Sequence, residues 1–386
     1  MRSPVPLGLF YAAIFVGNGA SSPYAPVWFH HRGLTGAEIG LILSAPMIAR
    51  VFTAPAIAMW ADSFKLRRTP LVILSLITAI SYVLLTPQFG FFWWFAVWFV
   101  ASSCFVSLPP LTDVIVMARA RIDGFNYGWP RGIGSAAFIL GNLVMGAVVA
   151  RYSPEYVLVW IVCAALLAAL GARTLLPPDP VRGEGEQARL SERLAGLREL
   201  VRDREFMLMV VSVGLIQSAH AFYYGFSALA WKQQGVAESM TGVLWASGVI
   251  VEIGFLWFME PWRRRMGPRN LLMLGGAAGV VRWTALAFAP PLWLVFPIQA
   301  LHTLSYAATF LASLQLVERL STRSNASGAQ LINSALQGGV LSGLATIGSG
   351  VLYDRFGALG YLAMTAMTVL GLLGAIRLYG VKRLDG

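Results

Sequence analysis

The sequence predicts an all-α membrane protein whose twelve transmembrane helices form two pseudo-symmetric bundles of six. Three observations support this fold class: the composition, the number of long apolar stretches and a repeat between the two halves. Of the 386 residues, 57% are hydrophobic and 12% are charged, and the mean hydropathy is +0.66. Soluble domains carry about 25% charged residues, which cover their surface. So few charges cannot cover a chain of this length, and the remaining apolar surface is expected to face lipid.

Apolar stretches long enough to cross a bilayer, which takes about 20 helical residues, occur twelve times. They cover 6–29, 38–60, 70–87, 91–118, 127–150, 155–176, 206–231, 240–259, 270–289, 292–317, 328–351 and 358–380. The fourth and the tenth are longer than a bilayer requires, which indicates tilt or a cytoplasmic extension. The first lacks the cleavage site of a signal peptide, so we expect it to be retained as a helix.

The longest break between apolar stretches separates a bundle over residues 1–176 from a bundle over residues 205–386. This linker, residues 177–204, begins with prolines and then becomes rich in charge and glycine. Leu190, Leu194, Leu197 and Val201 follow at three- and four-residue steps, which predicts an amphipathic helix on the cytoplasmic surface.

The two halves also resemble each other in sequence. A shift of 202 residues places Gly33 on Gly235, Gly40 on Gly242 and Arg50 on Glu252. Both stretches run from an outer loop through an apolar helix to a basic inner loop, which is typical of a parallel repeat.

Basic residues lie almost entirely on one side of the predicted membrane. With both termini inside, 22 of the 29 Lys and Arg residues fall in inner segments and four in outer loops. This is the positive-inside distribution. It predicts a multi-pass protein of the inner (plasma) membrane with both termini in the cytoplasm. It also explains the net charge of +11 without a nucleic-acid partner.

Motifs for catalysis or cofactor binding are absent from the sequence. It contains no Walker motif, no metal-ligand cluster and no Ser-His-Asp spacing. We therefore expect no enzymatic activity, no cofactor and no bound metal, and any energy for transport would come from a gradient.

Ionisable residues occur within the apolar stretches, where each costs at least about 2.5–3.5 kcal/mol at the bilayer centre. They are Arg50, Asp113, Arg131, Glu252, Arg282 and His302, with His220 as a weaker case. Three arginines against two carboxylates leave one positive charge without an acidic partner in the membrane. Because Arg forms bidentate bonds to carboxylates, such a cation suits an anionic substrate. The alternative is that these residues only hold helices together through ion pairs.

Several motifs resemble those of a known transporter family. The segments are Pro110-Leu111-Thr112-Asp113, then Tyr127-Gly128 with Arg131, Gly134, Ser135 and Phe138, then the stretch from Gln217 to Ala228, and Gly279 to Trp283. They resemble the 3-phenylpropionate permease group of the major facilitator superfamily over nearly the whole chain. Trp129-Pro130 and Gly132-Ile133 depart from the pattern of that group. The loop residues Asp62, Arg67 and Arg68 match part of the superfamily's gating-loop signature.

A more distant resemblance to the lactose permease group implies roles for individual residues. Its substrate-binding acid and arginine fall on Asp113 and Arg131, and its acid of the eighth helix falls on Glu252. Its further arginine and histidine fall on Arg282 and His302, whereas Ser305 replaces the carboxylate that works in proton coupling there. If protons are coupled, Glu252 or Asp113 must therefore carry the proton, and His302 is a candidate relay.

The resemblance implies a secondary transporter that works as a monomer on a small molecule. We expect a small organic anion, an aromatic carboxylate such as 3-phenylpropionate, carried in symport with protons by alternating access. The substrate-binding residues would be Asp113, Arg131, Glu252, Arg282, His302, His220, Tyr223 and Tyr224. The alternatives are a sugar or nucleoside proton symporter, a drug exporter, and a membrane sensor or scaffold that transports nothing.

Overall fold

The chain folds into helices that form two compact units. The computed structural model describes residues 3–180, 197–322 and 325–384, and within these ranges the β-structure consists of one isolated bridge between Leu66 and Pro180. Contacts within the chain assign Met1–Gly183 with Ser227–Val243 to the first unit. They assign Glu184–Phe226 with Leu244–Gly386 to the second.

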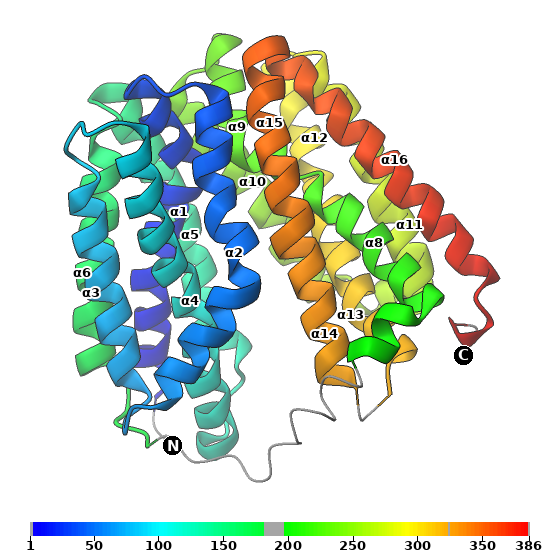
Figure 1. The fold of residues 1–386 in the computed structure, drawn as a ribbon, viewed down its shortest axis with the longest axis horizontal. Helices are drawn as coiled ribbons and strands as arrows, with labels where there is room; N and C mark the ends of the chain where they lie inside the picture. The colour runs from blue at the N-terminus through cyan, green and yellow to red at the C-terminus, as the bar shows by residue number, and fades with distance from the viewer. Residues whose placement is uncertain (1–2, 181–196, 323–324, 385–386) are drawn as a thin grey trace. The chain divides into compact units, whose positions relative to one another are not determined.

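The first six helices follow the predicted apolar stretches closely. They are α1 (Val5–His31), α2 (Gly36–Asp62), α3 (Arg68–Leu84), α4 (Phe91–Asp123), α5 (Gly128–Arg151) and α6 (Tyr156–Thr174). In this unit α1 packs against α5 and α6, and α3 packs against α4 and α6 (Figure 1).

Small residues let α1 and α5 approach each other closely. A Cβ atom on Gly19 would lie 2.2 Å from the carbonyl oxygen of Phe138, and one on Gly141 would lie 2.4 Å from that of Val16. Larger side chains at either position would separate the two backbones. This contact keeps Tyr11 on α1 near the polar residues of α4 and α5, which are described below.

The remaining helices belong mostly to the second unit. They are α8 (Arg204–Ser218), α9 (Ala221–Gln233), α10 (Glu238–Phe258), α11 (Glu260–Ala287), α12 (Leu292–Ala300), η1 (Thr303–Ala308), α13 (Thr309–Leu320), α14 (Ala326–Ser334), η2 (Ala335–Leu341), α15 (Ser342–Phe356), η3 (Gly357–Gly360), α16 (Tyr361–Arg377), η4 (Leu378–Gly380) and η5 (Lys382–Leu384). Here α11 packs against α16 and α13, and α8 packs against α16 and η2.

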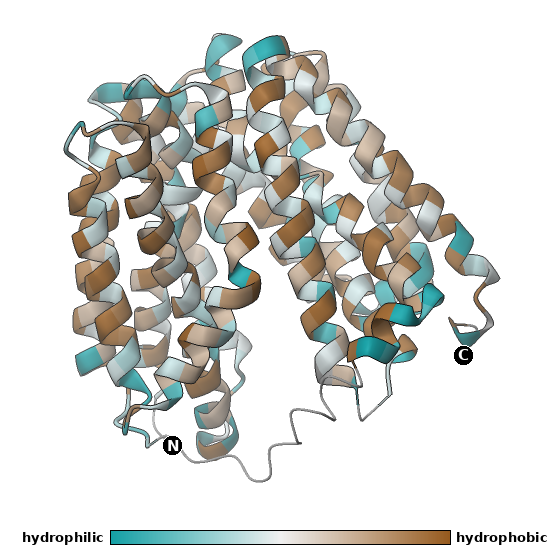
Figure 2. Cartoon of the chain, in the orientation of Figure 1, coloured by the Kyte–Doolittle hydropathy of each residue, from teal (hydrophilic) through white to brown (hydrophobic). Residues whose placement is uncertain are grey.

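The helices confirm the prediction of twelve membrane crossings. In the described residues, ten helical stretches are long and apolar enough to cross a membrane, and the shorter Arg68–Leu84 is also apolar. One of the ten, Gly328–Gly380, supplies two crossings because the chain turns at η3. Hydrophobic residues run along the helices, and hydrophilic residues gather at their ends (Figure 2). The chain is therefore a multi-pass membrane protein.

Three predicted helices, 206–231, 292–317 and 328–351, are less regular than the hydropathy indicates. The stretch 206–231 is two helices, α8 and α9, with a break at Ala219 and His220. The stretch 292–317 contains the π-helical segment η1, and a second such segment, η2, follows α14. Interruptions of this kind often occur at functional sites. Hydropathy does not reveal them, because it measures composition and not the hydrogen bonds of the backbone.

The predicted linker helix lies mostly outside the described residues, since 181–196 are not described. Residues 197–202 are helical. Asp203 then caps α8, and its carboxylate accepts the backbone N–H groups of Glu205 and Phe206.

Candidate functional site

A cluster on α1, α4 and α5 surrounds Asp113 in the first unit. The hydroxyl of Tyr127 donates to Asp113 Oδ1 over 2.8 Å, and the hydroxyl of Tyr11 donates to the same oxygen. Tyr11 is fully buried, whereas Asp113 and Tyr127 are half-buried. We call these three residues the Asp113 cluster. Its carboxylate is bound by two hydroxyl donors that belong to the protein.

Arg131 lies beside the Asp113 cluster on α5. Its guanidinium carbon is 4.2 Å from the ring centre of Phe15 and 5.7 Å from that of Tyr11. Among the described residues no hydrogen bond or ion pair is made by its half-buried side chain. Within the described residues of the first unit, Arg131 therefore makes no ion pair with the neighbouring Asp113. The guanidinium rests on aromatic faces, and its N–H donors are available to a ligand.

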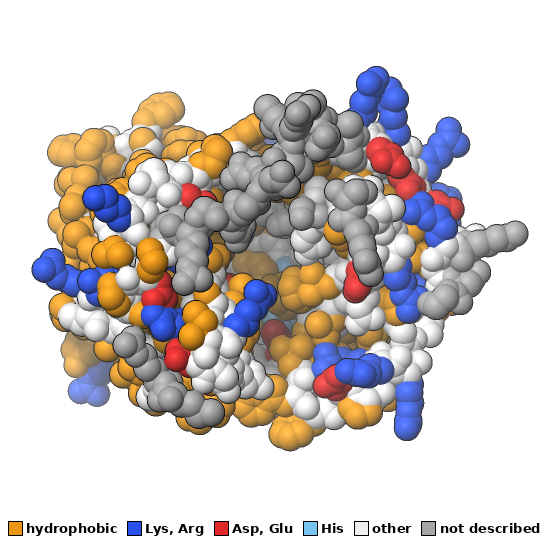
Figure 3. Space-filling model, turned by 90° about the horizontal axis from the view of Figure 1, so that it is seen from below, with side chains coloured by type: hydrophobic (Ala, Val, Ile, Leu, Met, Phe, Trp, Pro, Cys, Tyr) orange, Lys and Arg blue, Asp and Glu red, His pale blue; other side chains and the backbone are white. Residues whose placement is uncertain are grey.

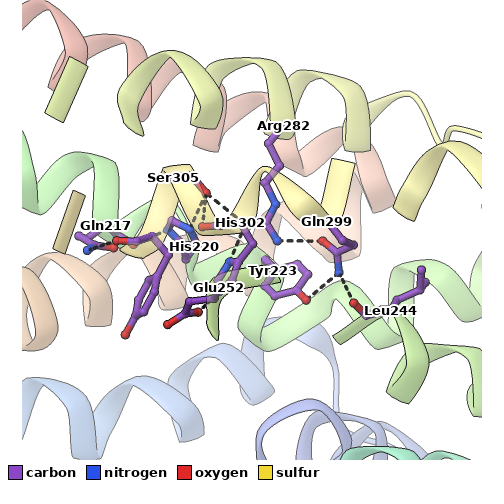
Figure 4. Close-up of polar contacts among 10 residues, drawn as sticks. Gln217, His220, Tyr223, Leu244, Glu252, Arg282, Gln299, His302 and Ser305 are labelled. Atoms are coloured by element: carbon purple, nitrogen blue, oxygen red, sulfur yellow. Dashed lines mark hydrogen bonds and ion pairs between the residues drawn. The ribbon is translucent and has the colours of Figure 1, made fainter. Parts of the chain in front are cut away.

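A second group of ionisable residues lies entirely in the second unit, around Arg282 (Figure 4). Arg282 is fully buried, and its guanidinium carbon is 4.5 Å from the ring centres of both Tyr223 and Trp283. It donates from one terminal nitrogen to Gln299 Oε1 over 2.9 Å, and the other lies 3.0 Å from His302 Nδ1. Within the described part of the chain, no carboxylate lies at ion-pair distance from Arg282.

The contact with Arg282 determines the protonation of His302. Arg can only donate hydrogen bonds, so His302 Nδ1 must accept, and the neutral ring carries its proton on Nε2. His302 Nε2 lies 3.6 Å from Glu252 Oε2. His302 thus stands between a cation on α11 and a carboxylate on α10, and we call Glu252, Arg282, Gln299 and His302 the Arg282 network.

His220 lies at the break between α8 and α9, and both of its ring nitrogens contact the protein. Nδ1 is 3.0 Å from the carbonyl oxygen of Gln217, and Nε2 is 3.2 Å from Ser305 Oγ. A carbonyl oxygen only accepts, so Nδ1 carries the proton. The predicted substrate contact would require one of these hydrogen bonds to open.

The end of α8 contacts both π-helical segments. Gln217 Nε2 donates to the carbonyl oxygen of Tyr306 in η1 over 3.2 Å. Ser218 Oγ donates to the carbonyl oxygen of Gln337 in η2 over 3.0 Å. Two neighbouring side chains at the end of α8 thereby satisfy backbone groups of both segments, in a membrane region where unpaired groups are costly.

Aromatic side chains lie around the Arg282 network. The rings of Tyr223 and Trp245 are stacked with their centres 4.8 Å apart, and Tyr224 stacks on His220 at 5.8 Å. Tyr223 is buried, whereas 36% of Tyr224 is exposed. Of the two predicted aromatic contacts, Tyr224 is therefore the more accessible in this state.

The predicted gating loop is anchored within the first unit. Arg67 N–H donates to the carbonyl oxygen of Asp179, and Arg68 donates to that of Arg173 over 3.1 Å. Arg119 pairs with the carboxylate of Asp179. Asp62 is the exposed last residue of α2. Lys and Arg side chains lie on the face of the molecule that Figure 3 shows.

Gln299 was not predicted from the sequence. Its side chain makes hydrogen bonds with Arg282, with the hydroxyl of Tyr223 and with the carbonyl oxygen of Leu244. It is uncharged and stands in an apolar stretch, so a search for ionisable residues misses it. Its position three residues before His302 places both side chains on one helix face, and that spacing is the signal that could have found it.

Comparison with known proteins identifies the family. Residues 5–363 match the model described as "MFS_1 like family". The chain belongs to this family of the major facilitator superfamily. Such a protein is a secondary transporter, embedded in the membrane and acting on a small molecule.

Individual relatives agree with this assignment. An Escherichia coli K12 protein named "probable 3-phenylpropionic acid transporter" is 29% identical over 354 residues, 91% of each chain. The maltose permease of Geobacillus stearothermophilus is 28% identical over 98% of this chain and 95% of its own. These relatives are a transporter and a permease, which supports the expectation that this chain is not an enzyme.

Solved structures share the fold at low sequence identity. A variant of the nucleoside transporter NupG superposes with a TM-score of 0.88 at 17% identity, covering 97% of this chain and 99% of its own. A bacterial homologue of the lysosomal transporter Spinster gives a TM-score of 0.71 at 16% identity, covering 99% and 98%.

Proposed function

We propose that the protein carries a small organic anion, an aromatic carboxylate such as 3-phenylpropionate, in symport with protons by alternating access. In this proposal it works as a monomer in the inner (plasma) membrane. The observation that carries the proposal is Arg131, a half-buried guanidinium on a membrane helix whose described contacts are the faces of Phe15 and Tyr11.

A carboxylate substrate is the ligand that this arrangement suits best. A cation in a membrane is costly unless it is paired or hydrated, and a carboxylate offers Arg two parallel hydrogen bonds. Asp113 already accepts from two tyrosine hydroxyls, so Arg131 need not be drawn towards it. The rings beneath Arg131 would also contact an aromatic substrate. The E. coli relative named for 3-phenylpropionic acid points in the same direction.

Glu252 is the proposed proton carrier, with His302 as relay and Asp113 as the next candidate. Ser305 stands where the lactose permease group has its coupling acid, and it hydrogen-bonds to His220. Glu252 lies 3.6 Å from a neutral His302 whose other nitrogen faces Arg282. Protonation of this pair would be favoured whenever Arg282 moves off His302, which links the proton to movement of the helices.

A sugar or nucleoside symporter is the second candidate. The maltose permease relative supports it, and a carboxylate with hydroxyl neighbours, such as the half-buried Asp113 cluster, is also suited to binding sugar hydroxyls.

Uptake into liposomes tests the proposal directly. Purified protein in liposomes with a proton gradient is offered radiolabelled 3-phenylpropionate, maltose or uridine in separate assays. We expect 3-phenylpropionate alone to accumulate. Accumulation of maltose or uridine without 3-phenylpropionate would support the second candidate and contradict the first.

Glu252→Gln tests the proton carrier in the same liposomes. Because Gln cannot bind and release a proton, we expect uphill accumulation to be abolished while exchange of labelled for unlabelled substrate continues. Glu260→Gln, which changes an exposed carboxylate at the start of α11, serves as the control and should accumulate substrate normally. If Glu252→Gln still concentrates substrate, the proton site lies elsewhere and Asp113→Asn is the next variant.

A further inference from the structure

Gln299 is a fully buried amide whose polar atoms are all bound within the second unit. Its Oε1 accepts from Arg282 over 2.9 Å. Its Nε2 donates to the hydroxyl of Tyr223 over 2.8 Å and to the carbonyl oxygen of Leu244 over 3.3 Å (Figure 4). Because Arg282 only donates, the amide can adopt just one orientation here.

The orientation of the Gln299 amide fixes the orientation of the Arg282 guanidinium. One terminal nitrogen of the guanidinium is held by Gln299, and the planar group then aims the other at His302 Nδ1, 3.0 Å away. A protonated His302 carries N–H groups on both nitrogens. Its Nδ1–H would face the N–H of Arg282, so protonation of His302 and the observed position of Arg282 exclude each other.

We propose that Gln299 is a positioning residue that sets when the pair of Glu252 and His302 takes up a proton. By holding Arg282 against Nδ1 it keeps His302 neutral, and the ring is released for protonation only when Arg282 moves. The incoming proton binds Nδ1, and the imidazolium can then pass the proton on Nε2 to the facing Glu252 carboxylate, as a relay does. The physiological role rests on the proton symport proposed above.

Several groups face His302 and contribute to its protonation. They are Glu252 from α10, Arg282 from α11, His220 and Tyr223 from the segment around the α8–α9 break, and Tyr306 from η1. Of these, Arg282 makes the hydrogen bond to Nδ1. Gln299 is the residue with a side-chain oxygen 2.9 Å from the other nitrogen of Arg282, so its replacement acts on His302 through Arg282.

Nitrogen NMR of the full-length protein tests this role without any substrate. The protein is labelled with ¹⁵N-histidine and placed in lipid nanodiscs, and the His302 signals are assigned by their loss in His302→Asn. In the wild type at pH 7 we expect an unprotonated Nδ1 and a protonated Nε2. In Gln299→Leu we expect this preference to be lost, with mixed tautomers or an imidazolium signal. Identical His302 signals in both proteins would overturn the proposal.

Asn333→Leu is the matched control. Asn333 is another buried amide of the second unit, and it donates to Ser313 over 2.9 Å. Among the described residues, no hydrogen bond or ion pair joins Asn333 to the Arg282 network, so its loss should destabilise the protein without changing the His302 signals. A change in those signals as large as in Gln299→Leu would show that the effect is only structural.

Gln299→Glu provides a second measurement in case Gln299→Leu does not fold. The variant keeps the shape and places a carboxylate directly on Arg282, which lowers the positive charge beside His302. We expect the pH at which proton-driven uptake of 3-phenylpropionate is half-maximal to rise by roughly one unit. An unchanged midpoint would count against the positioning role. If wild-type liposomes accumulate no 3-phenylpropionate, the proposed function fails, whereas the NMR comparison still decides the role of Gln299.

Discussion

Arg131 and Arg282 show how one residue type serves two purposes in the same protein. Arg282 is fully buried, and Gln299 and His302 accept hydrogen bonds from its two terminal nitrogens. Arg131 is half-buried, and its described contacts are aromatic faces. A guanidinium with free donors is suited to a ligand, whereas one with bound donors is suited to positioning its neighbours.

Replacing Arg131 by Lys separates charge from geometry. Lys keeps the positive charge but cannot form the planar bidentate pair, so we expect the affinity for 3-phenylpropionate to fall about tenfold. Isothermal titration calorimetry of the purified protein measures this change. Arg121→Lys, at an exposed position in the last turn of α4, is the control and should bind like the wild type. Unchanged affinity in a folded Arg131→Lys protein would indicate a structural role.

Helix ends decide where several of the polar contacts form. Thr35 and Glu38 make a capping box at the start of α2, and Asp203 caps α8. Arg383 Nη1 also lies 2.6 Å from Asp203 Oδ2. Asp203 thus joins the beginning of α8 to the C-terminal segment of the same unit.

Removal of this cap should destabilise the second unit. We expect Asp203→Ala to lower the free energy of unfolding by about 1 kcal/mol, since two backbone N–H groups and Arg383 lose their acceptor. Thermal unfolding in detergent measures the effect. Asp62→Ala removes an exposed carboxylate at the end of α2 and should change the stability much less. Equal losses in the two variants would show that the cap is unimportant.

The contribution of Asp203 should also depend on pH in a defined direction. Burial opposes ionisation of this carboxyl, but the hydrogen bonds from Arg383 and from the N–H of Phe206 outweigh burial and hold its pKa below the ordinary 3.8. A lowered pKa in the folded state stabilises the fold above the ordinary value. The difference in Tm between the wild type and Asp203→Ala should stay constant down to about pH 5 and shrink below pH 3.8. A difference that disappears at neutral pH would contradict this assignment.

The charge distribution predicts the orientation of the whole molecule in the membrane. With 22 basic residues in predicted inner segments and four in outer loops, we expect both termini and the 177–204 linker in the cytoplasm. We therefore fuse a reporter that works only in the cytoplasm after Gly386, and we expect this fusion to show reporter activity. A periplasmic reporter at the same site is the matched control, and its activity would overturn the predicted orientation.

Hydropathy was sufficient to predict the helices of this protein, because the bilayer imposes a minimum length of apolar helix wherever the chain crosses. The predicted stretch 38–60 and the observed α2, Gly36–Asp62, differ by two residues at each end. The ionisable residues could be recognised for the same reason, since each is costly in lipid. Their partners could not be predicted, because a partner depends on which helix faces are brought together.

Only the tertiary structure decided these pairings. It placed Asp113 with Tyr11 and Tyr127 instead of Arg131, and it joined Arg282 to the uncharged Gln299. It also broke the predicted seventh helix at His220, where side chains from α8 satisfy the carbonyl groups of η1 and η2. Helix length is a local property that composition reports. The hydrogen bonds described above join segments that are distant in the sequence, so the packing of the helices determines them.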